Sequence, residues 1–579
     1  QYIMNIHALL VNRFTEALQE MGVENAPVPV SRSARPEFGE YQFNGAMALA
    51  KQLKQKPRDI AEKIVETVKL DDIASKLEVA GPGFINVHLN DEWLSNQCEL
   101  SLTAPRLGIA KSKEQNIVVD YSSPNLAKEM HVGHLRTTII GDAVVKVLEF
   151  LGHNVIRQNH MGDWGTQFGM LLAHLSDKLQ DEVAETALSD LEDFYREAKV
   201  RFDEEEGFAD RAREYVVKLQ GGDAQCLALW EKFIDVSITH SEEVYDKLNV
   251  SLTRKDIMGE SAYNDDLANV ISDLKAKGLA VEDQGAQVVF IPELADKEGN
   301  PAVYIVQKSG GGYLYATTDL AAMRYRSGKL NADRTLILTD ARQALHFKQT
   351  EIVGRKAGFM KEEQTYEHCP FGVMLGSDGK PFKTRTGGTV KLVELLDEAV
   401  ERAGKLIAER DNDLSEDELK EVAHKVGIGA VKYADLSKNR TTDYMFNWDS
   451  MLSFEGNTAP YLQYAYTRVK SLFRKAGVDM ATMPVDINIA EKQEHALAVL
   501  LMQFEEVIGT VSREATPHVL CTYLYDVASA FMSFYEACPM LKDGIEPAVR
   551  DSRLALSALV AKTLEQGLTL LGIETLEKM

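Results

Sequence analysis

Two histidines flank a glycine in the sequence His131-Val132-Gly133-His134, where a helical pattern begins. The first turn of a helix presents free backbone N–H groups, and imidazole N–H groups add donors, so such a loop favours phosphate. Gly133 leaves room for a flat base, and Lys128 adds a cation upstream. We predict a nucleotide site in which His131 and His134 stabilise charge developing on a triphosphate, without a protein nucleophile.

A shared metal ion and a purely structural role are the alternatives for this pair. Histidines three positions apart can hold one ion, but a zinc site needs further ligands, and none lies nearby in the sequence. Capping or packing alone does not explain Gly133, which weakens the start of a helix. We therefore expect no protein-bound metal.

The elements around the loop predict a doubly wound, Rossmann-like α/β domain. The segment "NIVVDYSS" is typical of a buried strand, and apolar residues recur at helical spacing from Gly133 to Gly152. A second strand and loop follow in "HNVIRQNHMGDWG". In such a sheet, ligands bind at the carboxyl ends of the strands.

The rest of the chain suggests three domains. We predict an N-terminal α+β domain over 1–112, the catalytic domain over 113–389 and an all-α helical bundle over 390–579. Charged amphipathic segments predict a helical insertion around 175–260, and its acidic run "DEEE" is typical of a solvated face.

Composition limits the class of protein. The net charge of −24 disfavours non-specific coating of nucleic acid and leaves open an acidic enzyme with small substrates. The 5 scattered cysteines favour neither a disulfide framework nor a cysteine zinc site. We find no apolar run of roughly 18 residues and no secretory signal pattern, so we expect a cytoplasmic protein without a membrane span.

The ensemble of motifs resembles the arginyl-tRNA synthetases, a family of class I aminoacyl-tRNA synthetases, in their bacterial form. "HVGH" resembles the HIGH signature, and similarity continues through "GDWGTQFGML", "LYATTD", "DARQALH" and the closing "LGIETLEKM". The resemblance implies a ligase that makes arginyl-adenylate from arginine and ATP with Mg²⁺, then transfers arginine to its tRNA. It also implies a monomer that needs tRNA for the first step.

The second class I signature, KMSKS, is absent. The stretch "GSDGKPFKTRTGGTV" stands at the matching place, where Lys380 and Lys383 would share the phosphate work and Arg385 would assist. A basic surface turn is the alternative. By resemblance the ATP site comprises Lys128, His131, Gly133, His134, His346, Lys380 and Lys383.

A site for arginine needs carboxylates and neutral acceptors around a planar guanidinium. Asp120 ends the first strand, Asp319 lies one helical turn after Tyr315, and Gln343 follows "LILTD". By resemblance the arginine site comprises Asp120, Ser122, Asn125, Tyr315, Asp319 and Gln343. Asp120 and Asn125 would hold the α-ammonium, while Tyr315 and Asp319 would bind the guanidinium. For each aspartate taken alone, a strand or helix cap is the alternative.

The bundle interleaves aromatic and cationic side chains in "TAPYLQYAYTRVKSLFRK", a pattern that suits splayed RNA bases. By resemblance, Tyr461, Tyr464, Tyr535 and Met579 would form an anticodon pocket, and Phe84 and Asn86 would meet the tRNA elbow. Tyr535 and Phe84 are equally compatible with core packing. Two other functions remain open: another class I enzyme such as the cysteinyl one, whose metal-ligand pattern is missing, and an RNA-binding relative without catalysis.

Overall fold

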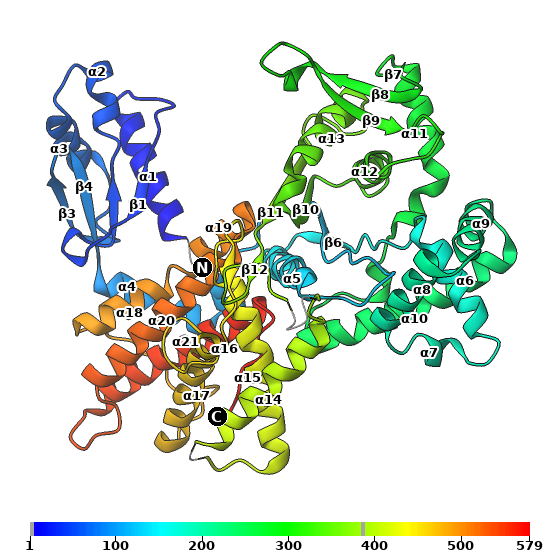
Figure 1. Cartoon of the computed structure of the whole chain (residues 1–579). Coiled ribbons are helices and arrows are strands. Elements are labelled where there is room, and N and C mark those ends of the chain that lie inside the picture. Colours follow the sequence, from blue (N-terminus) through cyan, green and yellow to red (C-terminus); the bar gives the residue numbers. More distant parts are fainter. Residues whose placement is uncertain (1–4, 384–387, 411) are drawn as a thin grey trace. The chain divides into compact units, whose positions relative to one another are not determined.

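The computed structural model of the chain describes residues 5–383, 388–410 and 412–579. Within these residues the chain divides into two compact units (Figure 1). The first contains the described residues up to Lys111 together with 453–570 and 574–579. The second contains 112–452 and a short return of the chain at Leu571–Ile573.

The second unit is built on a parallel sheet with the strand order β11-β10-β5-β6. Its strands are β5 (Asn116–Asp120), β6 (Asn154–Gln158), β10 (Arg334–Asp340) and β11 (Thr365–Phe371). Helix α5 (Leu135–Phe150) connects β5 to β6 and is buried along most of its length. A Cβ at Gly141 would lie 2.3 Å from the Tyr121 ring, so glycine permits this close helix–strand packing. The Rossmann-like sheet predicted from the sequence is confirmed.

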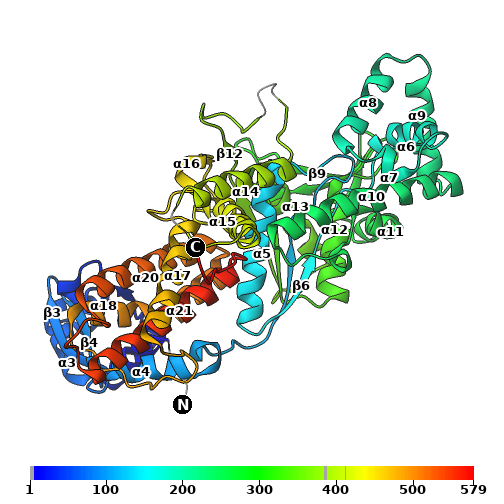
Figure 2. The same cartoon turned by 90° about the horizontal axis from the view of Figure 1, so that it is seen from below.

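A group of helices follows β6 and gathers at one side of the unit (Figure 2). Its members are α6 (Gln167–Lys178), α7 (Ala184–Ala187), α8 (Leu191–Glu204), α9 (Phe208–Gln220) and α10 (Ala224–Leu248). Asp190 caps α8 by accepting the N–H of Asp193, and Asp223 caps α10 in the same way. The acidic run 203–206 is exposed, as its composition predicts.

A separate antiparallel sheet, β7 (Ala280–Asp283), β8 (Ala286–Ile291) and β9 (Ala302–Gln307), comes next. It shares a core with α11 (Asn264–Ala276), α12 (Tyr315–Arg324) and α13 (Ala344–Lys356). A second sheet, separate from the parallel one, was not predicted, because a strand pattern does not specify the partner strand.

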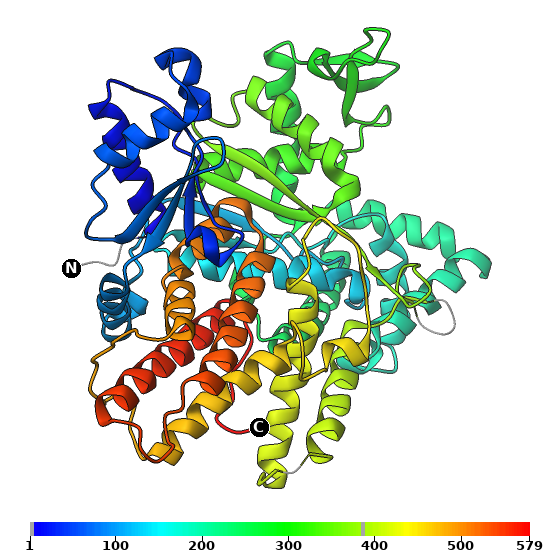
Figure 3. The same ribbon diagram turned by 90° about the vertical axis from the view of Figure 1, so that its left-hand side faces the viewer.

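The second unit ends with strands β12 (Met374–Leu375) and β13 (Tyr444–Met445) and with helices α14 (Leu392–Ala408), α15 (Glu416–Leu436) and α16 (Trp448–Met451). Figure 3 shows α14 and α15 as an antiparallel pair. A capping box of Ser415 and Glu418 begins α15. These helices lie in the second unit.

The first unit combines an antiparallel sheet with helices. The sheet has the order β1-β2-β4-β3. Its elements are α1 (Ile6–Glu20), β1 (Val30–Arg32), β2 (Tyr41–Phe43), α2 (Ala50–Leu53), α3 (Pro57–Thr67), β3 (Ala74–Ala80), β4 (Phe84–Leu89), α4 (Asp91–Thr103), α17 (Ala459–Ala476), α18 (Lys492–Leu501), α19 (Phe504–Glu514), α20 (Pro517–Ala537) and α21 (Pro547–Leu570). Among the described residues, no helix combines the length and apolar character that a membrane span requires.

Candidate active site

The histidine pair forms the turn that leads into α5. The Gly133 N–H donates to His131 Nδ1 at 3.0 Å, and the His131 N–H donates to His134 Nδ1 at 3.1 Å. The ring centroids lie 4.1 Å apart. These reciprocal bonds close a capping box over Val132–His134, which orients both rings through the backbone.

Both imidazoles are neutral in this arrangement. Each Nδ1 accepts a backbone proton, so the hydrogen-bond pattern assigns the ring proton of each histidine to Nε2. Burial, followed by repulsion from His131, lowers the pKa of His134 to about 3. Burial and the nearby Lys128 ammonium also lower the pKa of His131. The pair therefore offers neutral Nε2–H donors, which suit phosphate oxygens.

Gly133 has a role that we did not predict. A Cβ at this position would lie 2.6 Å from His131 Cε1 and 2.9 Å from His131 Nδ1. Glycine is thus required for the His131 ring to fold back onto its own loop. The space for a flat base, on which the sequence interpretation depended, is not the sole physical reason for this glycine.

A cavity of about 540 Å³ opens at the carboxyl ends of the parallel strands. Asp120 from the end of β5 and Asn125 from the following loop line it, together with Tyr315, Asp319, Gln343 and His346. All these residues were predicted for the arginine or ATP site, although they are far apart in the sequence. The cavity also contacts Ser123, whereas Ser122 does not line it.

Asp120 already has a cationic partner. Arg326, whose side chain is 3% exposed, donates from Nη2 to Asp120 Oδ2 at 2.9 Å, and Ser123 Oγ donates to Oδ1 at 2.9 Å. Ser122 lies beneath the loop, where its hydroxyl bonds Thr138 Oγ1 at 2.8 Å and Tyr245 OH at 2.7 Å. Asp120 and Ser122 therefore both form bonds that hold the loop, but only Asp120 lines the cavity.

One carboxyl group in this cavity, that of Glu260, was not predicted from the sequence. Burial, followed by repulsion from Asp163 and Asp319, raises the pKa of Glu260 to about 8. Glu260 in turn is the main cause of the raised pKa of Tyr315. A cation placed among these acids would reverse both shifts. The only local signal was a lone glutamate in "MGESAY", since its proximity to Asp319 depends on the tertiary fold.

His346 lies in the acidic part of the cavity. Its Nε2 is 2.5 Å from Asp319 Oδ2, and its ring packs beside Phe347 with centroids 5.0 Å apart. Tyr315 begins α12, so Asp319 is one turn along the same helix, as the sequence predicted. This contact orients the Asp319 carboxylate, whereas the resemblance implied an ATP contact for His346.

The lysines expected at the phosphates lie on separate segments. Lys128 Nζ lies 4.3 Å from the Tyr195 ring centroid on α8. Lys380 and Lys383 are exposed, and Lys383 forms an isolated bridge with Thr389. Arg385 lies outside the described residues. The chain beyond this loop is tied to the histidine turn, because the Val132 N–H donates to the Val390 carbonyl at 3.0 Å.

The first unit brings several predicted tRNA contacts together. Arg468 lies over the Tyr464 ring at 5.8 Å and over the Tyr535 ring at 4.9 Å. Arg468 and Tyr535 also line a cavity of about 350 Å³. Tyr461 packs beside Tyr525 with centroids 5.6 Å apart. Stacked aromatic and guanidinium planes of this kind suit RNA bases.

The remaining predicted tRNA contacts differ in exposure. Phe84 is half-buried at the start of β4, and Met579 is half-buried at the chain end. Asn86 is 0% exposed, and its Oδ1 accepts a bond from Gln42 Nε2 at 2.8 Å. The structure therefore presents Phe84 but encloses Asn86 within the sheet, so a direct RNA contact by Asn86 would require rearrangement.

Family models match nearly the whole chain. The catalytic domain of "tRNA synthetases class I (R)" matches residues 98–448, the "Arginyl tRNA synthetase N terminal domain" matches 8–89, and the "DALR anticodon binding domain" matches 462–579. The chain is 97% identical over 576 residues to the "Arginine--tRNA ligase" of Alteromonas mediterranea, covering 100% of both chains. The chain belongs to the arginyl-tRNA synthetases.

Relatives and solved structures of arginyl-tRNA synthetases agree with this assignment. The "Arginine--tRNA ligase" of Pseudoalteromonas atlantica is 76% identical, with 100% of both chains covered. The crystal structure of the Plasmodium falciparum arginyl-tRNA synthetase superposes with a TM-score of 0.87 at 28% identity and 100% coverage of both chains. That of Thermus thermophilus gives 0.84 at 25% identity, covering 99% of this chain and 100% of the other. The family and fold class predicted from the sequence are confirmed, and the cysteinyl alternative is excluded.

Proposed function

We propose that this arginyl-tRNA synthetase is an arginine–tRNA ligase that works in two steps. An oxygen of the arginine carboxylate attacks the α-phosphorus of ATP, the bond to the bridging oxygen breaks, and pyrophosphate leaves. The terminal ribose hydroxyl of tRNA(Arg) then attacks the carbonyl carbon of arginyl-adenylate, and AMP leaves. Mg²⁺ would arrive with the ATP phosphates.

The observation that carries this proposal is the acidic cavity at the carboxyl ends of the parallel strands, in the same unit as the neutral histidine donors. Glu260 and Asp319 supply carboxyl groups for a guanidinium. Both carboxyl groups also act on Tyr315, because each raises the pKa of its hydroxyl. A guanidinium offers several donors in a plane and can satisfy such acids together. A lysine ammonium would leave acceptors unpaired, which in comparable sites reduces kcat/KM by about 10⁴-fold.

The roles of the chain's own groups follow from their positions. The Nε2–H groups of His131 and His134 would donate to phosphate oxygens, and Lys128, Lys380 and Lys383 would supply positive charge there. Asn125 and Gln343 would contact the amino acid. Asp120 would hold its loop. Because its carboxylate already pairs with Arg326, it would attract the α-ammonium of arginine only weakly.

We further propose how the enzyme meets its tRNA. The cluster of Tyr464, Arg468 and Tyr535 would bind anticodon bases. Tyr461 and Met579 would contribute to the same anticodon pocket. Phe84 would contact the tRNA elbow. The domain limits 1–112, 113–389 and 390–579, a monomeric state and a cytoplasmic location belong to this proposal. So does a need for tRNA in the activation step.

The test is ATP–pyrophosphate exchange with purified protein. Arginine should support exchange, lysine should not, and tRNA(Arg) should be required for the full rate. Aminoacylation of tRNA(Arg) with labelled arginine checks the second step. Lack of exchange under every condition, with the protein folded, would contradict the proposed activity. Exchange that is equally fast without tRNA would contradict only the tRNA requirement.

A further inference from the structure

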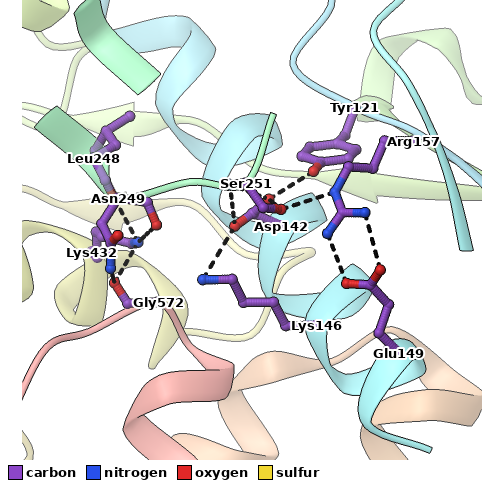
Figure 4. A network of polar contacts seen from close by, with 10 residues as sticks. All are labelled: Tyr121, Asp142, Lys146, Glu149, Arg157, Leu248, Asn249, Ser251, Lys432 and Gly572. Atoms are coloured by element: carbon purple, nitrogen blue, oxygen red, sulfur yellow. Dashed lines mark hydrogen bonds and ion pairs between the residues drawn. The ribbon is translucent and has the colours of Figure 1, made fainter. Parts of the chain in front are cut away.

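A buried lysine in the second unit binds backbone carbonyls from two distant segments (Figure 4). Lys432 on α15 is 1% exposed. Its Nζ donates to the Leu248 carbonyl at 2.6 Å and to the Gly572 carbonyl at 2.7 Å, with the Asn249 carbonyl at 3.4 Å. Leu248 ends α10, where the helix dipole favours a cation, so this contact offsets part of the cost of burying the ammonium.

The segment that supplies Gly572 is a short strap. After α21 the chain contributes Leu571–Ile573 to the second unit and then continues as residues 574–579 of the first unit. Leu571 is 1% and Ile573 2% exposed, so the strap is buried on both sides of the glycine. Asn249 adds a second bond, from Nδ2 to the Gly572 carbonyl at 3.2 Å.

Glycine suits the centre of this strap. Gly572 has a φ of +73°, and a Cβ there would lie 2.4 Å from Lys432 Nζ and 3.3 Å from Lys146 Nζ. Lys146 is on α5, the helix that follows the histidine turn, and it pairs with Asp142 at 3.7 Å. The strap therefore lies close to the Lys146 side chain of the helix that follows the histidine turn.

Two groups of polar contacts, one around Gly572 and one around Asp142, are joined by the backbone from Asn249 to Ser251 (Figure 4). Ser251 lies two residues after Asn249, and its N–H and hydroxyl both donate to the buried carboxylate of Asp142. Tyr121 donates from its hydroxyl to the same carboxylate at 2.7 Å. Tyr121 directly follows Asp120, which lines the substrate cavity. Hydrogen bonds join Ser251 and Tyr121 to Asp142, and the backbone joins Asn249 to Ser251 and Tyr121 to Asp120.

We propose that Lys432, Asn249 and Gly572 form a tail latch that couples the C-terminal residues to the activation step. The inference deepens the proposed function, because residues 574–579 end at Met579, the proposed tRNA contact. Movement of the tail pulls on the Gly572 carbonyl. The end of α10 and Lys146 respond, and the Ser251–Asp142–Tyr121 contacts transmit the change to Asp120 and α5. Lys432 and Asn249 are positioning residues in this device.

The latch is tested by variants that remove its bonds while keeping the backbone. Asn249 has a φ of +53°, so Asn249→Gly removes the side-chain donor and preserves the turn. Lys432→Met keeps the length of the side chain and removes the ammonium. Asn331→Gly is the matched control, since Asn331 is exposed and has a φ of +50°.

The assay is ATP–pyrophosphate exchange with the full chain at saturating tRNA(Arg), arginine and ATP. One neutral hydrogen bond predicts that Asn249→Gly lowers the rate by about 2- to 10-fold, and a charged donor predicts about 10- to 100-fold for Lys432→Met. KM for arginine and for ATP should stay within about twofold, as should every parameter of Asn331→Gly. The double variant should lose less than the product of both effects, because both side chains hold the same carbonyl.

Three outcomes overturn the latch. Both variants could retain the wild-type rate at saturating tRNA with only a lower Tm, which would mean that the contacts merely stabilise the fold. The loss could instead lie in KM for tRNA alone, which would limit the tail to binding. Wild-type protein without any exchange would overturn the proposed function together with the latch. If Lys432→Met does not fold, Asn249→Gly decides between these outcomes.

Discussion

Replacing Glu260 with glutamine tests whether the acidic cavity recognises a guanidinium. The pKa of Glu260 is raised to about 8 by burial and by repulsion from Asp163 and Asp319. A guanidinium binds the ionised carboxylate, so arginine binding in the wild type must remove a proton from Glu260. At pH 7 about one molecule in ten has Glu260 ionised, since each pKa unit corresponds to a tenfold ratio. KM for arginine should therefore fall roughly tenfold as pH rises from 7 to above 8.

Glu260→Gln should abolish this pH dependence and weaken binding. Loss of a charge-assisted hydrogen bond, about 1.5–3 kcal/mol, predicts a KM for arginine that is about 10- to 100-fold higher above pH 8. Near pH 6.5 the difference should narrow, because wild-type Glu260 is then mostly protonated. Glu298→Gln serves as the matched control, since Glu298 is exposed in the same unit.

The assay is arginine-dependent exchange at saturating ATP and tRNA between pH 6.5 and 8.5, with KM and kcat measured separately. Comparison with Glu260→Gln at each pH subtracts the titration of the arginine α-amino group and of tRNA-linked steps. A flat wild-type KM over this range, together with an unchanged KM in Glu260→Gln, would refute the reasoning. The acids would then face the cavity without holding the substrate.

The raised pKa of Glu260 also makes the free energy of unfolding depend on pH. Its folded-state pKa lies above the ordinary glutamate value of 4.5, so the native state binds more protons than the unfolded state between these values. The free energy of unfolding should therefore decrease as pH rises from about 4.5 to about 8 and then level off. Added arginine should raise Tm more strongly at pH 8 than at pH 6.5.

Three further substitutions probe the active site and its support. His134→Gln, which can place an amide donor near the Nε2 position, should retain more activity than His134→Ala, whose kcat should fall about 10²- to 10³-fold, measured as exchange at saturating substrates. His346→Ala should raise KM for arginine several-fold and leave KM for ATP nearly unchanged, because His346 orients Asp319. A selective rise in KM for ATP would instead support the ATP contact that the family resemblance implies. Asp435→Asn should destabilise the second unit by about 3–5 kcal/mol in chemical denaturation. The substitution removes the negative charge that pairs with the buried Arg136 guanidinium, which is 2% exposed and lies 3.3 Å from Asp435. A loss below about 1 kcal/mol would mean that the ion pair is dispensable.

Local sequence patterns were enough to predict the strand, histidine turn and helix that begin the second unit. A buried apolar strand, small polar residues and helical periodicity describe β5, the loop and α5 without any distant contact. The positions of Asp120 and Tyr315 at element ends followed from the same patterns. The fold of the His131 ring onto Gly133 did not, because a rotamer and a loop conformation are not encoded in residue spacing.

Features that depend on tertiary contacts were missed. Glu260 has no periodic or motif-like neighbours, and its environment is created by Asp163 and Asp319 from other segments. Arg326, the partner of Asp120, lies 206 positions away in the sequence. The association of α14 and α15 with the second unit follows from packing, which an amphipathic pattern alone does not determine.

The division of charge in the active site limits where its pH dependence arises. Burial lowers the pKa of His134 to about 3, so protonation of this ring cannot limit activity near neutral pH. In the proposed mechanism, the positive charge at the triphosphate then comes from the Mg²⁺ that arrives with ATP and from Lys128, Lys380 and Lys383. Glu260 is the group in the described cavity whose pKa lies near pH 8. An acidic limb of the pH profile should therefore appear in KM for arginine. A limb confined to kcat would instead point to the phosphate side of the site.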